Sequence, residues 1–76
     1  MTWAELVAPW PLDAYVRSRV DDGVWVKVGM TGYIVGREQR DNDLMVTVTW
    51  DNDTQTRVWA REIERTTGYH ERRKTA

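Results

Sequence analysis

A chain of 76 residues has room for one domain, and a formal net charge of −1 excludes a strong overall attraction to nucleic acid or an anionic membrane. The absence of cysteine and the presence of a single histidine exclude a disulfide, a thiolate metal site and an imidazole cluster. Five tryptophans can still fill a small core, because each ring buries roughly 150–250 Å². We therefore expect a folded domain without a cofactor or a metal.

The N-terminal residues lack the basic region and the long apolar stretch of a signal peptide. The longest apolar run is also far shorter than the roughly 20 residues that a membrane span needs. These features predict a cytoplasmic protein with no membrane partner.

Residues 1–12 predict a separate N-terminal segment that is irregular or forms one short helix. Thr2 and Glu5 have the spacing of a capping box, in which each residue satisfies the other's backbone N–H. Pro9 and Pro11 limit the helix to about two turns, so it must dock on its own domain or on a partner. Apolar residues at helical spacing would make that contact: Trp3, Leu6, Val7 and Trp10.

Residues 13–65 predict five short strands, because apolar and polar residues alternate with a period of two between Asp/Asn/Gly turns. Residues 24–28 are expected to be extended chain between the turns at 21–23 and 29–32. Residues 41–43 and 51–53, both Asp-Asn-Asp, predict two further turns. The positions expected to face inward are Val16, Ser18, Val20, Ile34, Gly36, Val46, Val48, Trp50, Val58 and Ile63. Residues 66–76 are expected to be a flexible C-terminal tail, basic at 72–74.

Several of these segments together resemble the SH3-like small-barrel superfamily, most closely its KOW and Tudor-like modules and small bacterial and phage domains. The resemblance rests on residues 28–35 with Gly29 and Gly32, on residues 46–51 ending in Trp-Asp, and on Val58 with the pair at 63–64. It implies an all-β, five-stranded SH3-like barrel over residues 13–65. Such modules usually have glycine directly after Trp-Asp, whereas this chain has Asn52 followed by Asp53.

In SH3-like and Tudor-like domains, aromatic residues of the first loop and neighbouring strands line a binding groove. The resemblance therefore nominates Tyr15, Trp25, Tyr33 and Trp59 as partner-binding residues, with Trp3 and Trp10 of the N-terminal segment as a second contact. Rigid rings offer large contact areas to peptides and bases. The alternative is that Trp25 and Trp59 only cover an undersized core.

Arginines on the outer faces of the strands could instead align into a basic strip that contacts phosphates while nearby rings stack on bases. Its members would be Arg17, Arg19, Arg37, Arg40 and Arg57. Acidic neighbours and the balanced net charge favour the alternative of a solvated face with mixed charge.

Other chemistry finds little support in the sequence. The aspartates near Trp50 could complete an aromatic cage, but they also fit ordinary turns. Neither Asp-Asn-Asp triplet continues into the ligand spacing of a calcium loop.

His70 lies in the tail, where it cannot be held for catalysis, and there is no glycine-rich phosphate loop or nucleophile motif. We expect no enzyme and no metal site.

The leading hypothesis is a non-catalytic module that binds a protein through surface aromatics. Single-stranded nucleic-acid binding is the alternative. A third hypothesis, based on size and on the resemblance to phage barrels, is a phage accessory or host-inhibitor protein, or a structural part of an assembly.

Overall fold

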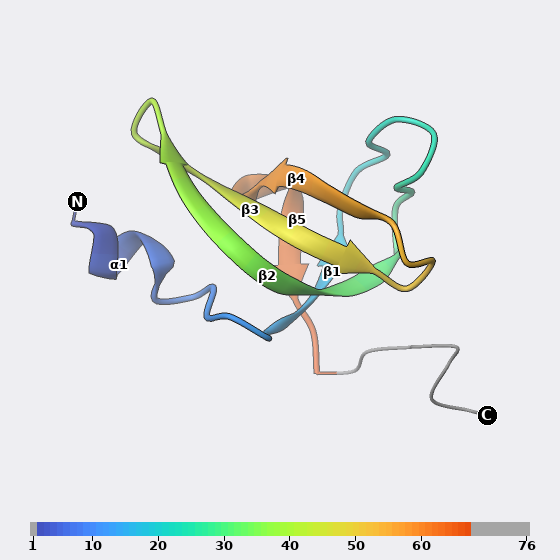
Figure 1. Cartoon of the computed structure of the whole chain (residues 1–76), viewed down its shortest axis with the longest axis horizontal. Helices are drawn as coiled ribbons and strands as arrows, with labels where there is room; N and C mark the ends of the chain where they lie inside the picture. The colour runs from blue at the N-terminus through green and yellow to red at the C-terminus, as the bar shows by residue number, and fades with distance from the viewer. Residues whose placement is uncertain (1, 68–76) are drawn as a thin grey trace.

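The computed structural model describes residues 2–67, which form one five-stranded antiparallel sheet and two short helical segments (Figure 1). The elements in chain order are α1 (Trp3–Val7), β1 (Tyr15–Ser18), β2 (Thr31–Arg40), β3 (Asp43–Trp50), β4 (Gln55–Trp59), the 3-10 helix η1 (Ala60–Glu62) and β5 (Ile63–Arg65). The strand order is β4-β3-β2-β1-β5. The prediction of an all-β domain with a short N-terminal helix is confirmed.

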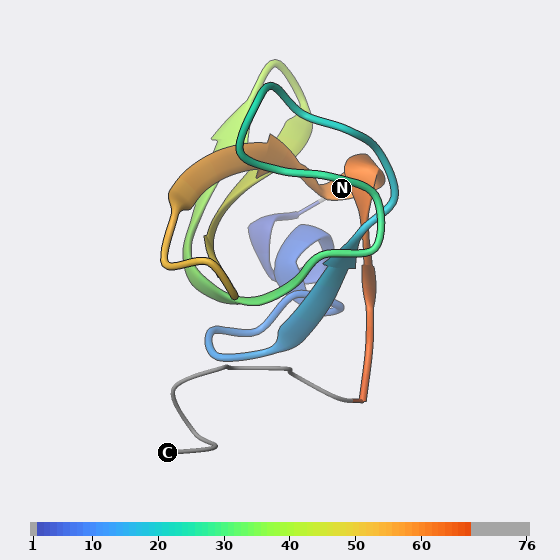
Figure 2. The same cartoon turned by 90° about the vertical axis from the view of Figure 1, so that its right-hand side faces the viewer.

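The sheet curls strongly around its inner face, as Figure 2 shows in a view from the side of the loop that joins β1 to β2. β4 and β5 are its two edge strands, and within residues 2–67 no ladder joins them. The structure is therefore one open, curled sheet. The 3-10 helix η1 connects the two edges and begins with the buried Ala60.

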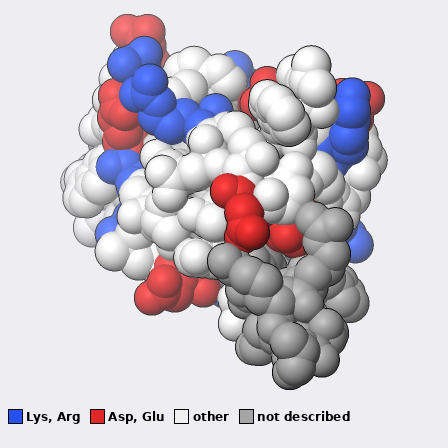
Figure 3. All heavy atoms as spheres, turned by 45° about the vertical axis from the view of Figure 1, so that its right-hand side comes forward, with Lys and Arg blue, Asp and Glu red and all other residues white. Residues whose placement is uncertain are grey.

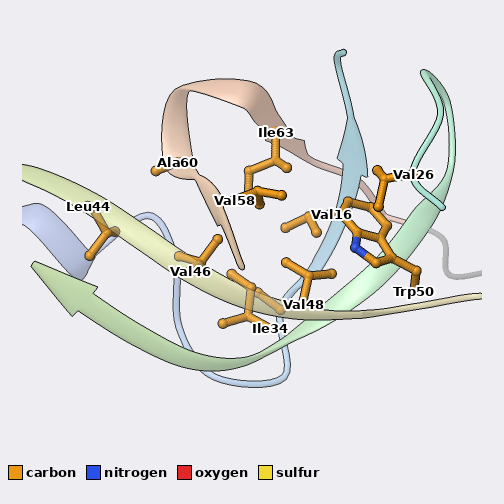
Figure 4. Packing of buried hydrophobic residues seen from close by; sticks show 11 residues of the cluster. Val16, Val26, Ile34, Leu44, Val46, Val48, Trp50, Val58, Ala60 and Ile63 are labelled. Atoms are coloured by element: carbon orange, nitrogen blue, oxygen red, sulfur yellow. The ribbon is translucent and has the colours of Figure 1, made fainter. Parts of the chain in front are cut away.

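The inner face of the sheet carries the core (Figure 4). Trp50 is 0% exposed and lies near Val16 and Val26, and its indole N–H donates to Thr56 Oγ1 at 2.9 Å. A buried ring of this size needs such a partner, because an unsatisfied indole N–H would be costly in an apolar interior. The predicted inward positions within β1, β3, β4 and β5 are confirmed, and Leu44 joins them at 1% exposure. Val20, also predicted to face inward, lies beyond the end of β1 and is half-buried.

Two details of the sequence interpretation are wrong. Residues 24–28, expected to be extended chain within the first loop, instead continue a turn that is closed by a single bridge between Asp22 and Val26. Gly36 does not face inward, because the register of β2 against β3 shifts between Ile34 and Gly36. The shift pairs Gly36 with the outward Thr47, and the extra residue exposes Val35. A bulge of this kind moves every following side chain to the opposite face.

Both Asp-Asn-Asp triplets form turns, as predicted. Asp41 and Asn42 have φ values of 50° and 66°, which suit a two-residue hairpin of the type favoured by the twist of antiparallel strands. Asp53 takes φ 69° in the next turn.

The N-terminal segment docks on its own sheet. Thr2 and Glu5 form the predicted capping box, with the Glu5 backbone N–H donating to Thr2 Oγ1 at 3.2 Å. Two guanidinium groups hold the following chain: Arg37 donates to the Trp10 carbonyl at 3.2 Å and Arg65 to the Pro9 carbonyl at 2.9 Å. The half-buried side chains that pack on the core are Leu6, Val7 and Trp10.

No helix within residues 2–67 has the length and apolar character to cross a membrane. The predicted basic cluster at 72–74 and His70 lie outside the described residues.

Candidate functional site

The loop between β1 and β2, residues 19–30, presents the most exposed large apolar side chains of residues 2–67. Val24 is 77% exposed, Trp25 63% and Val28 62%. We call these three residues the loop patch. Their neighbour Val26 points the other way and is 0% exposed in the core. The loop is thus anchored by one buried valine and displays three apolar side chains to solvent.

Backbone hydrogen bonds fix the shape of this loop. The Asp22 N–H donates to the Val26 carbonyl at 2.8 Å, and the Val28 N–H donates to Asp21 Oδ1 at 2.9 Å. At the base of the loop, the Ser18 backbone N–H donates to the Met30 carbonyl at 2.8 Å, while the Met30 side chain packs on the core. A loop whose conformation is fixed in this way loses little entropy when it binds.

The turn between β3 and β4 supports the loop from the side. The Asn52 side-chain amide Nδ2 donates to the Trp25 carbonyl at 3.1 Å, while its Oδ1 accepts from the Thr54 N–H at 3.0 Å. One asparagine therefore holds its own turn and fixes the backbone at Trp25. This contact places residues 51–54 beside the loop patch.

The structure places the other nominated aromatics elsewhere. Tyr15 and Tyr33 are paired across β1 and β2 on the outer face of the sheet, where Tyr15 is 38% exposed. Trp59 lies half-buried on the outer face of β4, and the Arg61 guanidinium stacks over its ring at 4.8 Å. The six nominated rings do not form one surface.

Two of the nominated tryptophans lie in the N-terminal segment, on the side of the molecule away from the loop patch (Figure 1). Trp3 is 44% exposed, whereas Trp10 packs against the core. Trp10 therefore contributes to the packing of its own domain.

The arginines of the predicted basic strip are dispersed and have carboxylate or carbonyl partners. Arg17 and Arg19 share Glu64, with Arg17 Nε donating to Glu64 Oε2 at 3.1 Å. Arg37 lies beyond the bulge, where its register partner Val46 faces inward, and bonds the N-terminal segment. The two remaining arginines share Glu38: Arg40 and Arg57.

These contacts with arginines also lower the pKa of two glutamates, Glu64 and Glu38. The hydrogen bond from Arg17, followed by the charges of Arg17 and Arg19, lowers the pKa of Glu64 below its usual value. The hydrogen bond from Arg40 does the same for the pKa of Glu38, with a smaller contribution from Arg57. Both glutamates are therefore held in their charged forms, which offset the neighbouring arginines.

Val24 and Val28 were not singled out from the sequence, because their alternation with Trp25 and Val26 was interpreted as extended chain. The signal that could have found them is a run of four apolar residues within five, between two glycines and without room for a paired strand. Within residues 2–67, no group of three or more acidic or histidine side chains could hold a metal ion.

No protein-family model, curated protein or solved structure matches this chain.

Proposed function

We propose that this chain is a non-catalytic protein-binding module of the SH3-like small-barrel type and that its loop patch is the contact surface. The strand order, the strong curl of the sheet and the long loop between the first two strands support the fold assignment. The observation that carries the function is the exposure of Trp25 on a loop anchored by the buried Val26.

Trp25 is expected to contribute most of the binding free energy. A Trp ring that becomes buried at an interface is often among the few residues whose truncation costs 2 kcal/mol or more in binding. Val24 and Val28 add apolar surface beside it, and the hydrogen bonds of the loop reduce the entropy lost on binding. Exposed apolar side chains on a small domain otherwise promote aggregation, so a partner that covers them accounts for their presence.

Single-stranded nucleic-acid binding and a phage accessory or host-inhibitor role stay predictions. The ion pairs with Glu38 and Glu64 leave less positive charge for phosphates than the arginine content suggests. Titration of tryptophan fluorescence with oligonucleotides at low salt separates the two binding modes, because the phosphate contribution is then strongest. Quenching that disappears at high salt would favour nucleic acid.

The direct experiment is affinity capture from a lysate of the source cells, with and without nuclease, followed by binding measurements on the captured protein. The Trp25→Ser variant should weaken binding by about 30-fold or more, as expected for loss of a ring worth about 2 kcal/mol. Trp3→Ser is the matched control, because it removes an exposed tryptophan from the distant N-terminal segment. Equal affinity of wild type and Trp25→Ser would refute the proposed surface.

A further inference from the structure

One edge of β4 has no strand beside it in the part of the chain that the structure describes, and we call it the free edge. The only isolated bridge within residues 2–67 joins Asp22 to Val26 in the loop. The register of β4 against β3 is regular along all five residues of β4, without a bulge. The strand contains no proline, and Arg57 is its only charged residue. β4 therefore has few of the features with which edge strands usually avoid pairing with another chain.

A hydrogen bond at the start of the ladder shows which backbone groups of β4 are used by β3. The Trp50 N–H donates to the Thr54 carbonyl at 2.8 Å. Hydrogen-bonded and non-hydrogen-bonded pairs alternate along an antiparallel ladder. Thr56 and Val58 therefore bond β3, and the alternate residues of β4 turn their N–H and carbonyl groups toward the free edge.

These alternate residues are Gln55, Arg57 and Trp59. The Trp59 N–H agrees with this orientation, because it donates to Glu62 Oε1 at 3.3 Å and not to β3. No such bond is formed, among residues 2–67, by the backbone N–H and carbonyl groups of Gln55 and Arg57. Unpaired backbone groups are rarely buried, because they would lose their hydrogen bonds to water. Both residues have exposed side chains, so the free edge faces solvent at these two positions.

The free edge begins beside the loop patch. Gln55 follows the turn whose Asn52 side chain donates to the Trp25 carbonyl at 3.1 Å. One extended segment of a partner can therefore cover Trp25 and continue along β4.

Hydrogen bonding at the free edge restricts the partner more than charge does at the loop patch. Residues 19–30 contain two aspartates, one arginine and one lysine, a net charge of zero. Figure 3 shows basic atoms beside acidic atoms in the upper part of the molecule, with much uncharged surface between them. An extended polypeptide offers N–H and carbonyl groups at the two-residue spacing of a strand. A phosphate backbone has acceptors but no alternating donors, so it does not match the free edge.

The charges beside the strand favour a partner peptide over a second copy of the chain. Antiparallel pairing of the whole of β4 with itself would place Arg57 of the two copies opposite each other, where like charges repel. Arg57 and Arg40 share the carboxylate of Glu38, so these three side chains keep a net charge of +1 whichever arginine the carboxylate contacts. An acidic residue opposite Arg57 would compensate this charge.

We infer that the free edge of β4 takes an extended segment of a partner protein as an added strand, with an acidic residue opposite Arg57. The inference rests on the proposed function, because the same segment covers Trp25 and then continues along the edge. Backbone hydrogen bonds would supply affinity, whereas the side-chain contacts at Trp25 and Arg57 would supply specificity.

Amide hydrogen exchange in the free chain tests the geometry of the edge. The amides of Gln55 and Arg57 should exchange at least about tenfold faster than those of Thr56 and Val58, which are bonded to β3. Equal protection of the four amides would show that the edge is already paired and would overturn the inference.

A random dodecapeptide library selected on the wild-type full chain provides the probe. Peptides that bind wild type but not Trp25→Ser should contain an acidic residue. At saturation, such a peptide should slow exchange at Gln55 and Arg57 by about tenfold or more, because their N–H groups then donate to the peptide. Methylation of single backbone nitrogens of the peptide should weaken binding at alternate positions, because only every second N–H of an added strand faces β4.

Two substitutions at position 55 separate the backbone from the side chain. Gln55→Pro removes the N–H that points to the free edge, and proline is tolerated at the first residue of an edge strand. Gln55→Ala is the matched control, because it removes the same side chain and keeps the N–H. Gln55→Pro should bind the peptide about tenfold more weakly than Gln55→Ala does.

Arg57→Ala tests the charge of the partner. It keeps the backbone N–H and should lower the affinity of the selected peptide by up to about fivefold, as expected for loss of an exposed ion pair. Selected peptides without an acidic residue, or with an affinity that Arg57→Ala does not change, would overturn the acidic character assigned to the partner.

The outcomes distinguish the inference from the proposed function. Trp25-dependent peptides that leave the amides of Gln55 and Arg57 unprotected, or that bind both position-55 variants equally, would overturn the inference and leave the proposed function standing. Self-association of the free chain that Gln55→Pro abolishes would assign the edge to a second copy and would also overturn the inference. If none of the selected peptides depends on Trp25, the proposed surface is wrong, and the inference is wrong with it. Should Gln55→Pro fail to fold, amide protection and the methylated peptides still decide the question.

Discussion

Gly32 of β2 is paired with Trp50 of β3, and it leaves no room for a side chain. A Cβ atom at this position would lie 2.5 Å from the Thr49 carbonyl oxygen, 2.8 Å from Val48 Cγ1 and 3.0 Å from Trp50 Cα. Non-bonded carbon and oxygen atoms normally lie at least about 3.3 Å apart, and two carbon atoms at least about 3.5 Å apart. The first two contacts are therefore short by roughly 0.8 Å and 0.7 Å. Two of the three atoms belong to the backbone of β3 and cannot rotate away.

Gly32→Ala should therefore destabilise the domain by about 2–3 kcal/mol, at the upper end of the cost of overpacking. This is a large share of the roughly 3–10 kcal/mol that stabilises a domain of this size. Gly36→Ala is the matched control in the same strand, because its Cβ would meet Thr47 at an ordinary 3.5 Å. Alanine there restricts the unfolded chain, so we expect no loss of stability or a gain of up to about 1 kcal/mol.

Urea denaturation followed by tryptophan fluorescence and circular dichroism measures both variants in one experiment. Surface substitutions usually change the free energy of unfolding by no more than about 0.5 kcal/mol. If the free energy of unfolding of Gly32→Ala lies within that range of wild type, the close approach of β2 to β3 is not a constraint on this fold. A destabilised Gly36→Ala would contradict the bulge that places Gly36 on the outer face.

Two further predictions concern the loop and the ion pairs. Val26→Ala should lower the free energy of unfolding by about 2 kcal/mol, because the loop loses its buried anchor. The rate of amide hydrogen exchange in residues 20–30 should rise well above that in β3. Unchanged protection of the loop would contradict the anchoring role of Val26. The second prediction concerns pH. The pKa of Glu64 in the folded state lies below its usual value of 4.5, mainly because of the hydrogen bond from Arg17. The ionised Glu64 therefore contributes fully to the stability of the fold above pH 4.5, and this contribution is lost as the pH falls through the lowered pKa. Glu64→Gln should therefore flatten the decline of the urea midpoint between pH 5 and pH 3, and identical declines in the two proteins would show that the pair contributes nothing.

Local chemistry determined much of this protein. Two-residue alternation placed Val16, Val46, Val48 and Trp50 on the inner face, because successive strand residues point to opposite sides. The capping box at Thr2 and the two Asp-Asn-Asp turns were also predictable, since each depends on side chains within a few residues of one another.

Tertiary structure decided what happens where several segments meet. The bulge at Val35, which turns Gly36 outward and Arg37 toward the N-terminal segment, depends on how β2 must bend over β3. Residues 24–28 have the composition of a strand, but no neighbouring strand offers them a ladder beyond one bridge. Their side chains therefore follow the loop's own geometry, with Val26 in the core and Trp25 in solvent. Alternation alone cannot distinguish that arrangement from a strand, because exposure depends on partners that are distant in the chain.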